Sequence, residues 1–551
     1  MEKIVLVAIN SQYIHTNLAV RYLKTYVEKY SDREIDIYES NINNQLSNII
    51  RDIYELSPTK LIFSTYIWNK EYVFKIVKEI KKILPNVEIS LGGPEVSYDS
   101  EMVLIENKEI DFLLIGEGEK VLLNLLTKDI EDVKGVYFRQ DEKIVYNGDE
   151  FPIENLDEIP FPYTSEELQQ ENKILYYESS RGCPFSCSYC LSSIDKGVRY
   201  FSVERVKNDL KQFLENGIDL IKFVDRTFNL RKDRYLEIWR FLLENYKEGT
   251  TFHFEINANI FDEEVIEFLK TVPKDYFQFE IGVQSIHKDT MESINRRNLL
   301  ERLERNVKAI TKNIHLHLDL IAGLPYDTYE SFKESFDYVY KLSPEMIQLG
   351  FLKILKGTKI SHEIEKYNYR YMDFPPYEVF SNDFITYEDI CRLKDIEKAL
   401  DYYYNSEKFK KSVEYIIENN YSSPFDFYED IASFYKERGY LDIGHKEVNI
   451  FNHLVDFYLK KNFENYDIFI EHLKFDYLSI RKPGSYPEWF ISEKNKDKYN
   501  EILEKKGFTS NRQGHKMTEL ENFKYNVIED KKEKIDIFFE YNNREIKITV
   551  C

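Results

Sequence analysis

Three of the five cysteines in this 551-residue chain are clustered. Cys183, Cys187 and Cys190 have the spacing C-x3-C-x2-C. Three thiolates on a short loop can bind an iron–sulfur cluster, and a four-iron cluster held by three cysteines leaves one iron open to another ligand. Structural zinc takes four protein ligands, and the nearest downstream histidine, His253, is remote in sequence. A zinc site with a distant fourth ligand and three unrelated buried thiols remain the alternatives.

Polar residues and glycines end the predicted strands that follow the cysteines. They are Asp225, Glu255, Asn257, Gln284 and Gly323. Singly, each is explained by a strand that ends in a turn, because polar residues and glycines commonly mark turns. Their order behind the cysteine cluster favours a shared site at the carboxyl ends of the strands.

A second set of candidate residues lies within residues 1–130. Gly92 and Gly93 end a predicted strand, where two glycines let a large planar or nucleotide ligand approach the backbone closely. Glu117 begins a predicted helix, so capping of the helix dipole explains its carboxylate equally well. The whole set is Asn10, Ser64, Thr65, Gly92, Gly93, Glu117 and Gly118.

The first region of the chain alternates strands and helices. Ile4–Ile9 is a continuous apolar run, as in a buried parallel strand. Further strands are predicted at Ile35–Tyr38, Leu61–Phe63, Val87–Leu91 and Phe112–Ile115, and helices at Leu18–Tyr30, Tyr72–Leu84 and Lys120–Leu126. Repeated β-α units predict a doubly wound parallel (Rossmann-like) sheet, which binds ligands at the carboxyl ends of its strands.

A second β-α series begins near Leu175, after a predicted hairpin at Gly135–Tyr146 and a proline-containing connector. Prolines stiffen such connectors and stop helices. Six strand–helix units favour a full or partial parallel barrel of the TIM type, here a partial (β/α)6 barrel. Its strands are predicted at Leu175–Ser179, Ile221–Val224, Phe252–Ile256, Phe277–Val283, His315–Ile321 and Met346–Phe351.

The pattern changes after about Tyr367. Residues 385–475 are rich in Tyr, Glu and Lys at helical spacing, and a hairpin is predicted from Lys534–Phe539 and Glu545–Val550 around Asn542-Asn543. None of these residues could be tied to chemistry. The predicted divisions are a sheet domain at 1–130, a hairpin and linker at 131–170, a barrel at 171–365 and a mostly helical C-terminal domain, ending in the β-hairpin, at 366–551.

Composition excludes several classes of protein. The chain has 75 Lys+Arg against 97 Asp+Glu, a net charge of −22, whereas duplex nucleic-acid binders usually carry a basic face. No apolar stretch approaches the ~20 residues that span a bilayer, and the chain begins with a strand-like run and not with a signal peptide. We therefore expect a cytoplasmic protein without a membrane span, for which nucleic acid is an unlikely partner.

The cysteine spacing, with an aromatic residue before the last cysteine, resembles the signature of the radical S-adenosylmethionine (SAM) enzymes. In that family the three cysteines hold a [4Fe–4S] cluster, the open iron chelates SAM, and reductive cleavage yields methionine and a 5′-deoxyadenosyl radical. The resemblance implies that Cys183, Cys187 and Cys190 are metal ligands and catalytic residues. It implies SAM contacts at Tyr189 and Gly323 (adenine), Asp225 (methionine amino group), Glu255 and Asn257 (ribose and carboxylate) and Gln284. The family's common Gly-Gly-Glu is absent at Asp225.

Residues 1–130 together with the barrel resemble the cobalamin-binding branch of this family. The resemblance rests on Ser90–Glu95 and Ile115–Glu119, and it implies that the second set of candidate residues binds cobalamin. The pattern Asp-x-His-x-x-Gly, which supplies a lower axial histidine, is missing. His15 lies in the corresponding loop but out of frame, and a lone loop histidine is more often a surface residue than a metal ligand.

The resemblance implies a cobalamin-dependent radical SAM methyltransferase that acts on an unactivated carbon of a small-molecule or peptide substrate. It also implies a low-potential electron donor, a flavodoxin or a ferredoxin. A radical SAM cyclase or rearrangement enzyme without methyl transfer is one alternative, and a non-enzymatic iron–sulfur redox sensor is another. A methylthiotransferase acting on tRNA would want further cluster cysteines in the N-terminal domain, but the first 182 residues contain none.

Overall fold

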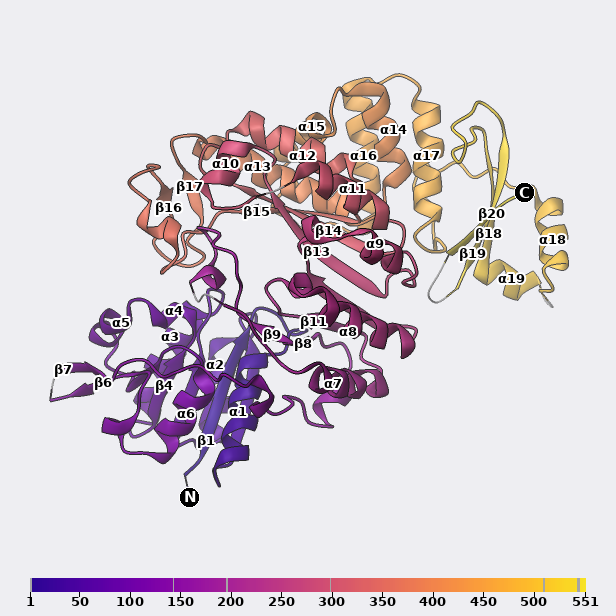
Figure 1. Cartoon of the computed structure of the whole chain (residues 1–551). Helices are drawn as coiled ribbons and strands as arrows, with labels where there is room; N and C mark the ends of the chain where they lie inside the picture. The colour runs from indigo at the N-terminus through magenta and orange to yellow at the C-terminus, as the bar shows by residue number, and fades with distance from the viewer. Residues whose placement is uncertain (1, 142, 195–196, 298, 509–510, 543–545) are drawn as a thin grey trace. The chain divides into compact units, whose positions relative to one another are not determined.

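The computed structural model describes residues 2–141, 143–194, 197–297, 299–508, 511–542 and 546–551. The chain folds into two compact units. Unit 1 comprises Met1–Thr328 and Gly350–Thr386, and unit 2 comprises Tyr329–Leu349 and Tyr387–Cys551. Figure 1 labels their helices and strands.

Unit 1 begins with a seven-stranded sheet in the order β2-β1-β3-β4-β5-β6-β7. The first five strands pair in parallel, and the last two form an antiparallel hairpin that extends the sheet beside β5. The strands are β1 (Ile4–Asn10), β2 (Ile35–Asn41), β3 (Lys60–Ser64), β4 (Glu88–Gly92), β5 (Phe112–Leu114), β6 (Val136–Gln140) and β7 (Lys143–Tyr146).

Helices cover both faces of this sheet. On one face, Val5, Val7 and Ile9 pack against helices α2 (Leu46–Glu55) and α3 (Lys70–Ile83). Helices α4 (Pro94–Ser97) and α5 (Ser100–Glu106), which follow β4, join this same face. On the other face, the alternate residues of β1 pack against α1 (Leu18–Tyr30) and α6 (Gly118–Thr127). The prediction of a doubly wound sheet is confirmed.

A second sheet is a partial barrel of six strands in the order β15-β14-β13-β12-β11-β8, of which β8 to β14 lie in unit 1. Its described pairings are parallel. The strands are β8 (Leu175–Tyr177), β11 (Leu220–Phe223), β12 (Thr251–Glu255), β13 (Phe277–Gln284), β14 (His315–Ala322) and β15 (Met346–Phe351), and the helices between them include α7 (Val203–Asn216), α8 (Lys232–Glu244), α9 (Glu263–Leu269), α10 (Lys288–Ser293) and α11 (Leu300–Ile310). All six predicted barrel strands are confirmed to within a few residues.

The two faces of the barrel strands differ in chemistry. Along β14, Leu316 and Leu318 are buried against the helices, whereas the intervening His315, His317 and Asp319 lie on the partly exposed face. This period of two arises because successive strand side chains point to opposite sides. The inner face of the barrel is therefore polar, in contrast to the branched aliphatic interior of a closed barrel.

Unit 2 is mostly helical and ends in a three-stranded antiparallel sheet in the order β18-β19-β20. The predicted final hairpin corresponds to β19 (Ile535–Tyr541) and β20 (Ile546–Val550), whereas β18 (Thr518–Phe523) was not predicted. Asn543, at the predicted turn, lies outside the described residues. The helices are α12 (Tyr329–Lys341), α13 (Tyr387–Leu400), α14 (Lys410–Asn420), α15 (Pro424–Arg438), α16 (Glu447–Lys461), α17 (Tyr466–Leu478), α18 (Lys496–Lys505) and α19 (Asn511–Met517).

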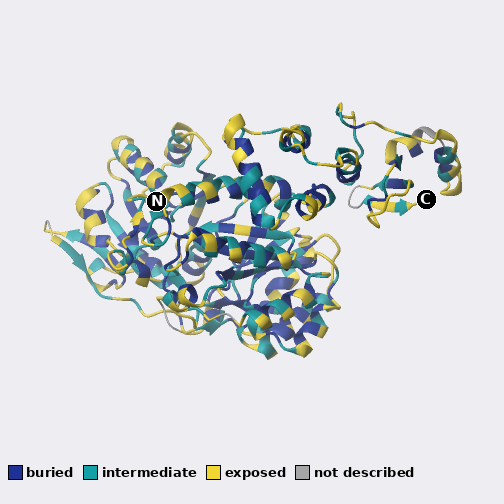
Figure 2. Ribbon diagram, turned by 90° about the horizontal axis from the view of Figure 1, so that it is seen from above, coloured by how far each residue is buried: buried dark blue, intermediate teal, exposed yellow. Residues whose placement is uncertain are grey.

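Burial follows these elements. Figure 2 shows buried residues concentrated on the strands and on the inward sides of the helices, with exposed residues on the connecting loops. Within the part of the chain that the structure describes, no helix combines the length and apolar character needed to cross a bilayer.

Candidate active site

The cysteine cluster lies on a loop whose two ends are paired. After β8, the short strand β9 (Ser180–Arg181) pairs antiparallel with β10 (Arg199–Tyr200). Gly182 has a φ of 97°, and a Cβ atom there would lie 2.1 Å from the backbone oxygen of Gly197. Because only glycine fits this approach, the base of the loop is held closed near the carboxyl end of β8.

The three thiols are free and differ in exposure. Cys187 is buried, whereas Cys183 and Cys190 are half-buried. The hydroxyl of Ser193 donates to the backbone oxygens of Cys187 (2.9 Å) and Cys190 (2.7 Å), which orders the turn between them. Among the described residues, no group of three or more His, Cys, Asp or Glu side chains is arranged to hold a metal ion. The ligand role of the cysteines stays a prediction from their spacing.

Arg296, which the sequence analysis did not identify, links the cysteine loop to β13. Its guanidinium donates to the hydroxyl of Tyr189 (3.3 Å) and to the backbone oxygen of Gly282 (2.6 Å). Burial raises the pKa of the Cys187 thiol, and Arg296, which hydrogen-bonds to it, opposes this shift. Burial also raises the pKa of Tyr189 to about 12. Arg296 belongs to no motif, so only the fold reveals its position beside Cys187.

The side chain of Asp225 hydrogen-bonds to the segment that precedes the cysteines. Its buried carboxylate accepts hydrogen bonds from the backbone N (2.8 Å) and hydroxyl (2.7 Å) of Ser179 and from the hydroxyl of Ser180. Burial raises the pKa of this carboxyl, and these hydrogen bonds oppose the shift. Asp225 therefore orders the junction between β8 and the cysteine loop, and its contact with SAM stays a prediction.

Two carboxylates and one amide on the barrel strands have either an unpaired buried oxygen or a raised pKa. Oε1 of Gln284, which has a left-handed backbone (φ 69°), and Oδ1 of Asp319 are buried without a hydrogen-bond partner among the described residues. Burial raises the pKa of Glu255 to about 7 and raises that of Asp319, to which Glu280 adds. Unpaired buried acceptors cost free energy, so these oxygens suit a ligand that donates hydrogen bonds.

The two other predicted SAM-contact residues on strand ends hold local structure. The backbone of Asn257 exchanges two hydrogen bonds of 2.9 Å with the side chain of Asn229. Gly323 has a φ of 87°, and its backbone oxygen accepts from the hydroxyl of Tyr369 (3.1 Å) and from Nδ2 of Asn382 (2.9 Å). Both residues shape the loops at the carboxyl ends of β12 and β14.

On the same inner face, two nitrogen atoms lie within ion-pair distance of the Glu280 carboxylate. Its Oε2 lies 3.1 Å from Nζ of Lys222 and 3.0 Å from Nε2 of His253. Burial acts to raise the pKa of Glu280, but these two partners outweigh burial and lower it to about 2. His317 contacts Gln278, and burial lowers the pKa of His317 to about 3. Glu280 is thus satisfied within the protein, unlike Gln284 and Asp319.

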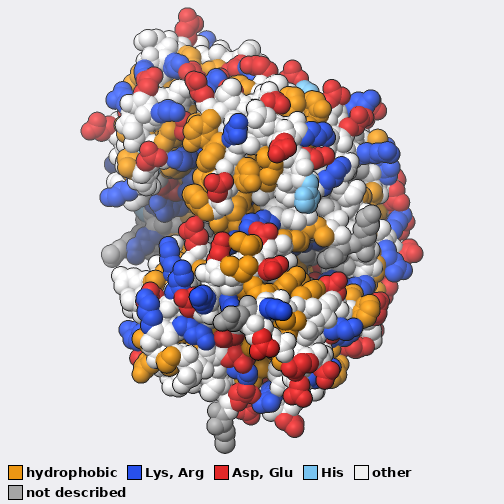
Figure 3. Space-filling view, turned by 90° about the vertical axis from the view of Figure 1, so that its left-hand side faces the viewer, with side chains coloured by type: hydrophobic (Ala, Val, Ile, Leu, Met, Phe, Trp, Pro, Cys, Tyr) orange, Lys and Arg blue, Asp and Glu red, His pale blue; other side chains and the backbone are white. Residues whose placement is uncertain are grey.

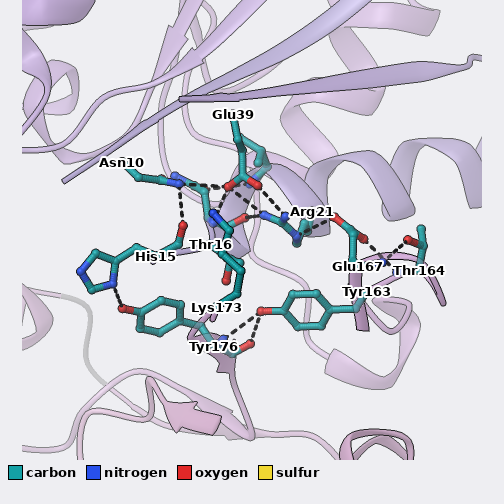
Figure 4. Close-up of polar contacts among 12 residues, drawn as sticks. Asn10, His15, Thr16, Arg21, Glu39, Tyr163, Thr164, Glu167, Lys173 and Tyr176 are labelled. Atoms are coloured by element: carbon teal, nitrogen blue, oxygen red, sulfur yellow. Dashed lines mark hydrogen bonds and ion pairs between the residues drawn. The ribbon is translucent and has the colours of Figure 1, made fainter. Parts of the chain in front are cut away.

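The loop after β1 is fastened to the barrel, as Figure 4 shows. Nδ2 of Asn10 donates to the backbone oxygen of His15 (2.9 Å) and to Glu39 (3.1 Å), which pairs with Arg21 at 2.6 Å. Nδ1 of His15 lies 2.7 Å from the hydroxyl of Tyr176 on β8, and burial lowers the pKa of His15. The side chains of Asn10 and His15 therefore serve this attachment, and cobalamin binding by Asn10 stays a prediction.

The loops after β3 and β4 meet closely. Gly93 has a φ of 111°, and a Cβ atom there would lie 2.5 Å from the backbone oxygen of Thr65, so only glycine permits this contact. The hydroxyl of Ser64 accepts a hydrogen bond from Asn17 at 3.2 Å, whereas the hydroxyl of Thr65 is buried without a partner among the described residues. Gly92, the last residue of β4, completes this edge of the sheet.

The loop after β3 also carries a pair of stacked aromatic residues, one exposed and one half-buried, that the sequence analysis missed. Trp68 is 42% exposed and stacks on Tyr66, with ring centroids 4.5 Å apart. Its indole Nε1 donates to the backbone oxygen of Ile9. A tryptophan placed just after a strand of a ligand-binding sheet is the signal that could have identified it.

Glu117 and Gly118 lie at the start of α6, beside the cysteine loop. The Glu117 carboxylate binds Arg199 and lies 3.3 Å from Arg181. Burial acts to raise the pKa of Glu117, but these arginines outweigh it and lower the pKa. A Cβ atom on Gly118 would lie 2.8 Å from Cδ2 of Leu23 on α1, so Gly118 lies close to that helix. Both residues have structural partners, and their contacts with cobalamin stay predictions.

Comparisons with protein families divide the chain in the same order as its sheets. The B12 binding domain matches residues 4–126 and the Radical SAM superfamily matches residues 177–339. The chain belongs to the cobalamin-binding radical SAM enzymes. A protein family of unknown function (DUF4080) matches residues 365–539 of this enzyme.

Two named relatives align with more than half of this chain. The chain is 27% identical over 398 residues to the cobalamin-dependent radical SAM methyltransferase TokK of Streptomyces tokunonensis, covering 67% of this chain and 58% of TokK. It is 23% identical over 365 residues to the anaerobic magnesium-protoporphyrin IX monomethyl ester cyclase of Rubrivivax gelatinosus, covering 61% of this chain and 64% of the cyclase. The alignments thus span less than two thirds of each relative.

A solved structure shares the fold. The cobalamin-dependent radical SAM enzyme OxsB, with aqua-cobalamin and SAM bound, superposes with a TM-score of 0.59 at 15% identity, covering 87% of this chain and 84% of OxsB. The cofactors of this family are a [4Fe–4S] cluster, SAM and cobalamin. The three free thiols on one loop are of the donor type that such a cluster takes. Among the described residues, the oxygens of Gln284 and Asp319 and the hydroxyl of Thr65 are buried without a hydrogen-bond partner, and the ligands that they contact stay predictions.

Proposed function

We propose that this radical SAM enzyme is a cobalamin-dependent methyltransferase that transfers a methyl group to an unactivated carbon of a small molecule or peptide. The observation that carries the proposal is the attachment of the three-cysteine loop to the B12-binding domain within one compact unit. The named activity of TokK supports the same assignment. We also retain the divisions 1–130, 131–170, 171–365 and 366–551 as proposed domains.

Each group of residues has a part in this proposal. Cys183, Cys187 and Cys190 would hold the cluster, while the oxygens of Gln284 and Asp319 would accept hydrogen bonds from SAM. The edge at Ser64, Thr65, Gly92 and Gly93 would hold cobalamin, and the paired sheets would keep water from the reacting carbon. When bound, the cluster and SAM supply a radical that removes a hydrogen atom, and cobalamin supplies the methyl group.

A low-potential electron donor of the flavodoxin or ferredoxin kind is the proposed protein partner. The net charge of −22 continues to disfavour nucleic acid. On the face that Figure 3 shows, acidic and basic side chains are interspersed and form no continuous basic surface. We retain the expectation of a cytoplasmic protein from the sequence alone.

Radical chemistry is tested first, with the full chain reconstituted anaerobically with iron and sulfide. On addition of SAM and dithionite, we expect 5′-deoxyadenosine and methionine by liquid chromatography and mass spectrometry. Cys187→Ala should abolish this product, whereas Cys391→Ala, outside the cluster loop, should not. Equal yields from the wild type and Cys187→Ala would contradict the radical assignment.

Ring formation without methyl transfer is the second candidate, because the Rubrivivax relative is named a cyclase. SAM with a deuterated methyl group separates the two. Methyl transfer predicts a candidate substrate heavier by one labelled methyl group, whereas ring formation predicts a product without the label. A converted but unlabelled product would therefore favour the cyclase.

A further inference from the structure

The two strands at the base of the cysteine loop present arginines directly opposite each other. Arg181 on β9 and Arg199 on β10 are partners in the antiparallel register. Like charges in this position repel and weaken the strand pair. The pairing therefore needs carboxylates close by to offset the repulsion.

Those carboxylates come from the N-terminal sheet domain, at the start of α6. The Glu117 carboxylate accepts hydrogen bonds from both η nitrogens of Arg199, and it lies 3.3 Å from Nη1 of Arg181. Glu119 accepts from Nη2 of Arg181 at 2.6 Å and is only 4% exposed. One glutamate thus bridges the two opposed arginines, and the second holds Arg181 from the same helix turn.

Every nitrogen of the Arg181 guanidinium faces a carboxylate. Its Nε binds Glu178 at 2.9 Å. It also lies over the ring of Tyr22 on α1, 5.6 Å from the centroid. Arg181 directly precedes Gly182 and Cys183, so the N-terminal domain holds the backbone from which the cysteine loop begins.

The backbone of the domain connector joins the same cluster. The N–H of Ile153 donates to Glu117 at 3.3 Å, and its backbone oxygen accepts from Arg199. Both carboxylate oxygens of Glu117 are therefore in use. A charged, partly buried group with this many partners is held in one place.

We propose that Glu117 and Glu119 are positioning residues that hold the base of the cysteine loop closed through Arg181 and Arg199, and that neither contacts cobalamin. The inference rests on the proposed function only in giving the loop its role. The contacts of Glu117 and Glu119 with Arg181 and Arg199, here called the clamp, are a property of the chain without cofactors, so they can be tested separately.

The test measures how fast the thiols react in the full-length, cofactor-free protein kept anaerobic. N-ethylmaleimide labelling is followed for each cysteine by mass spectrometry in the wild type, Glu117→Gln and Glu119→Gln. Glu154→Gln is the matched control, because Glu154 is exposed in the same connector, next to Ile153. Cys391 and Cys551 serve as internal references, since both lie outside the loop.

Loss of either carboxylate should accelerate labelling of Cys183, Cys187 and Cys190 on the order of tenfold, because charge-assisted hydrogen bonds that close the loop are lost. The rates of Cys391 and Cys551 should stay unchanged, as should all rates in Glu154→Gln. Cobalamin retained after loading should match the wild type in Glu117→Gln.

The clamp would be overturned if labelling rates in both variants stayed within about twofold of wild type. Such a difference is small beside the effect expected from losing charged hydrogen bonds. Loss of cobalamin from Glu117→Gln without faster labelling would also overturn it and make Glu117 a cobalamin contact. Should the glutamine variants not fold, Arg199→Lys keeps the charge while losing the two-nitrogen contact, and the same outcomes apply. A protein that forms no cluster but shows the faster labelling would contradict the proposed function and leave the clamp intact.

Discussion

Single carboxylates in the barrel differ in whether other side chains of the protein pair with them. Glu280 is paired with Lys222 and His253, and its pKa falls to about 2. Glu255 is a neighbouring carboxylate, and burial raises its pKa to about 7. The contrast indicates that Glu280 belongs to the framework, and it supports the prediction that Glu255 contacts SAM.

Glu255→Gln should stabilise the cofactor-free protein at high pH. Since the pKa is raised to about 7 on folding, the folded state binds a proton more tightly, and the wild type loses stability as pH rises from the ordinary carboxyl pKa to about 7. The neutral glutamine removes this loss. We expect a gain of about 2 kcal/mol at pH 8, after allowance for partial exposure, that vanishes near pH 4.5.

Thermal unfolding at a series of pH values measures this effect. Glu215→Gln is the control, because Glu215 is exposed on α7 and its side chain is 63% accessible. A melting-temperature difference between Glu255→Gln and wild type that does not grow with pH would contradict the raised pKa.

At the scale of elements, helix ends are held by residues far away in sequence. Asp476 on α17 accepts hydrogen bonds from the backbone N–H of Lys411 (3.1 Å) and Ser412 (2.7 Å) in the first turn of α14, and from the Ser412 hydroxyl (2.6 Å). These amides have no partner within their own helix. The buried Asp476 therefore joins two helices of unit 2.

Asp476→Ala should destabilise unit 2 by about 2 kcal/mol, because it removes a cap and leaves buried donors unpaired. Asp476→Asn keeps one acceptor oxygen and should cost less. Asp456→Ala, at an exposed position in the middle of α16, is the control. Urea denaturation followed by hydrogen exchange in α14 measures the change, and equal protection of α14 in Asp476→Ala and wild type would contradict the account.

Local sequence patterns predicted most elements of unit 1 but missed some elsewhere. A continuous apolar run identified β1, because both faces of this parallel strand are buried. The strand β18 was missed because its Glu519 and Glu521 read as exposed, whereas Lys474 and Lys494 neutralise them in the interior. Such pairing depends on distant parts of the chain and leaves no local pattern.

The same distinction applies to the site. The spacing of Cys183, Cys187 and Cys190 identified the cluster loop directly. Arg296 was missed, and the partners of Glu117 could not be predicted, because those contacts join residues brought together only by the fold. Sequence thus located the residues expected to bind cofactors better than the residues that position them.

At the scale of the whole molecule, unit 1 combines both cofactor-binding families in one compact body, and residues of the DUF4080 match lie in both units. The sheet domain contributes the carboxylates that pair with Arg181 beside the cysteine loop, so ion pairs connect the two cofactor-binding domains. We therefore propose that one chain carries a single cluster and cobalamin together.

Metal and cofactor content of the anaerobically reconstituted full chain, loaded with hydroxocobalamin and desalted, tests this claim most directly. We predict about four iron atoms and about one cobalt atom per chain, with cluster and cobalamin absorbance in the same visible spectrum. Iron without cobalt would contradict the cobalamin assignment, and cobalt without iron would contradict the radical SAM assignment.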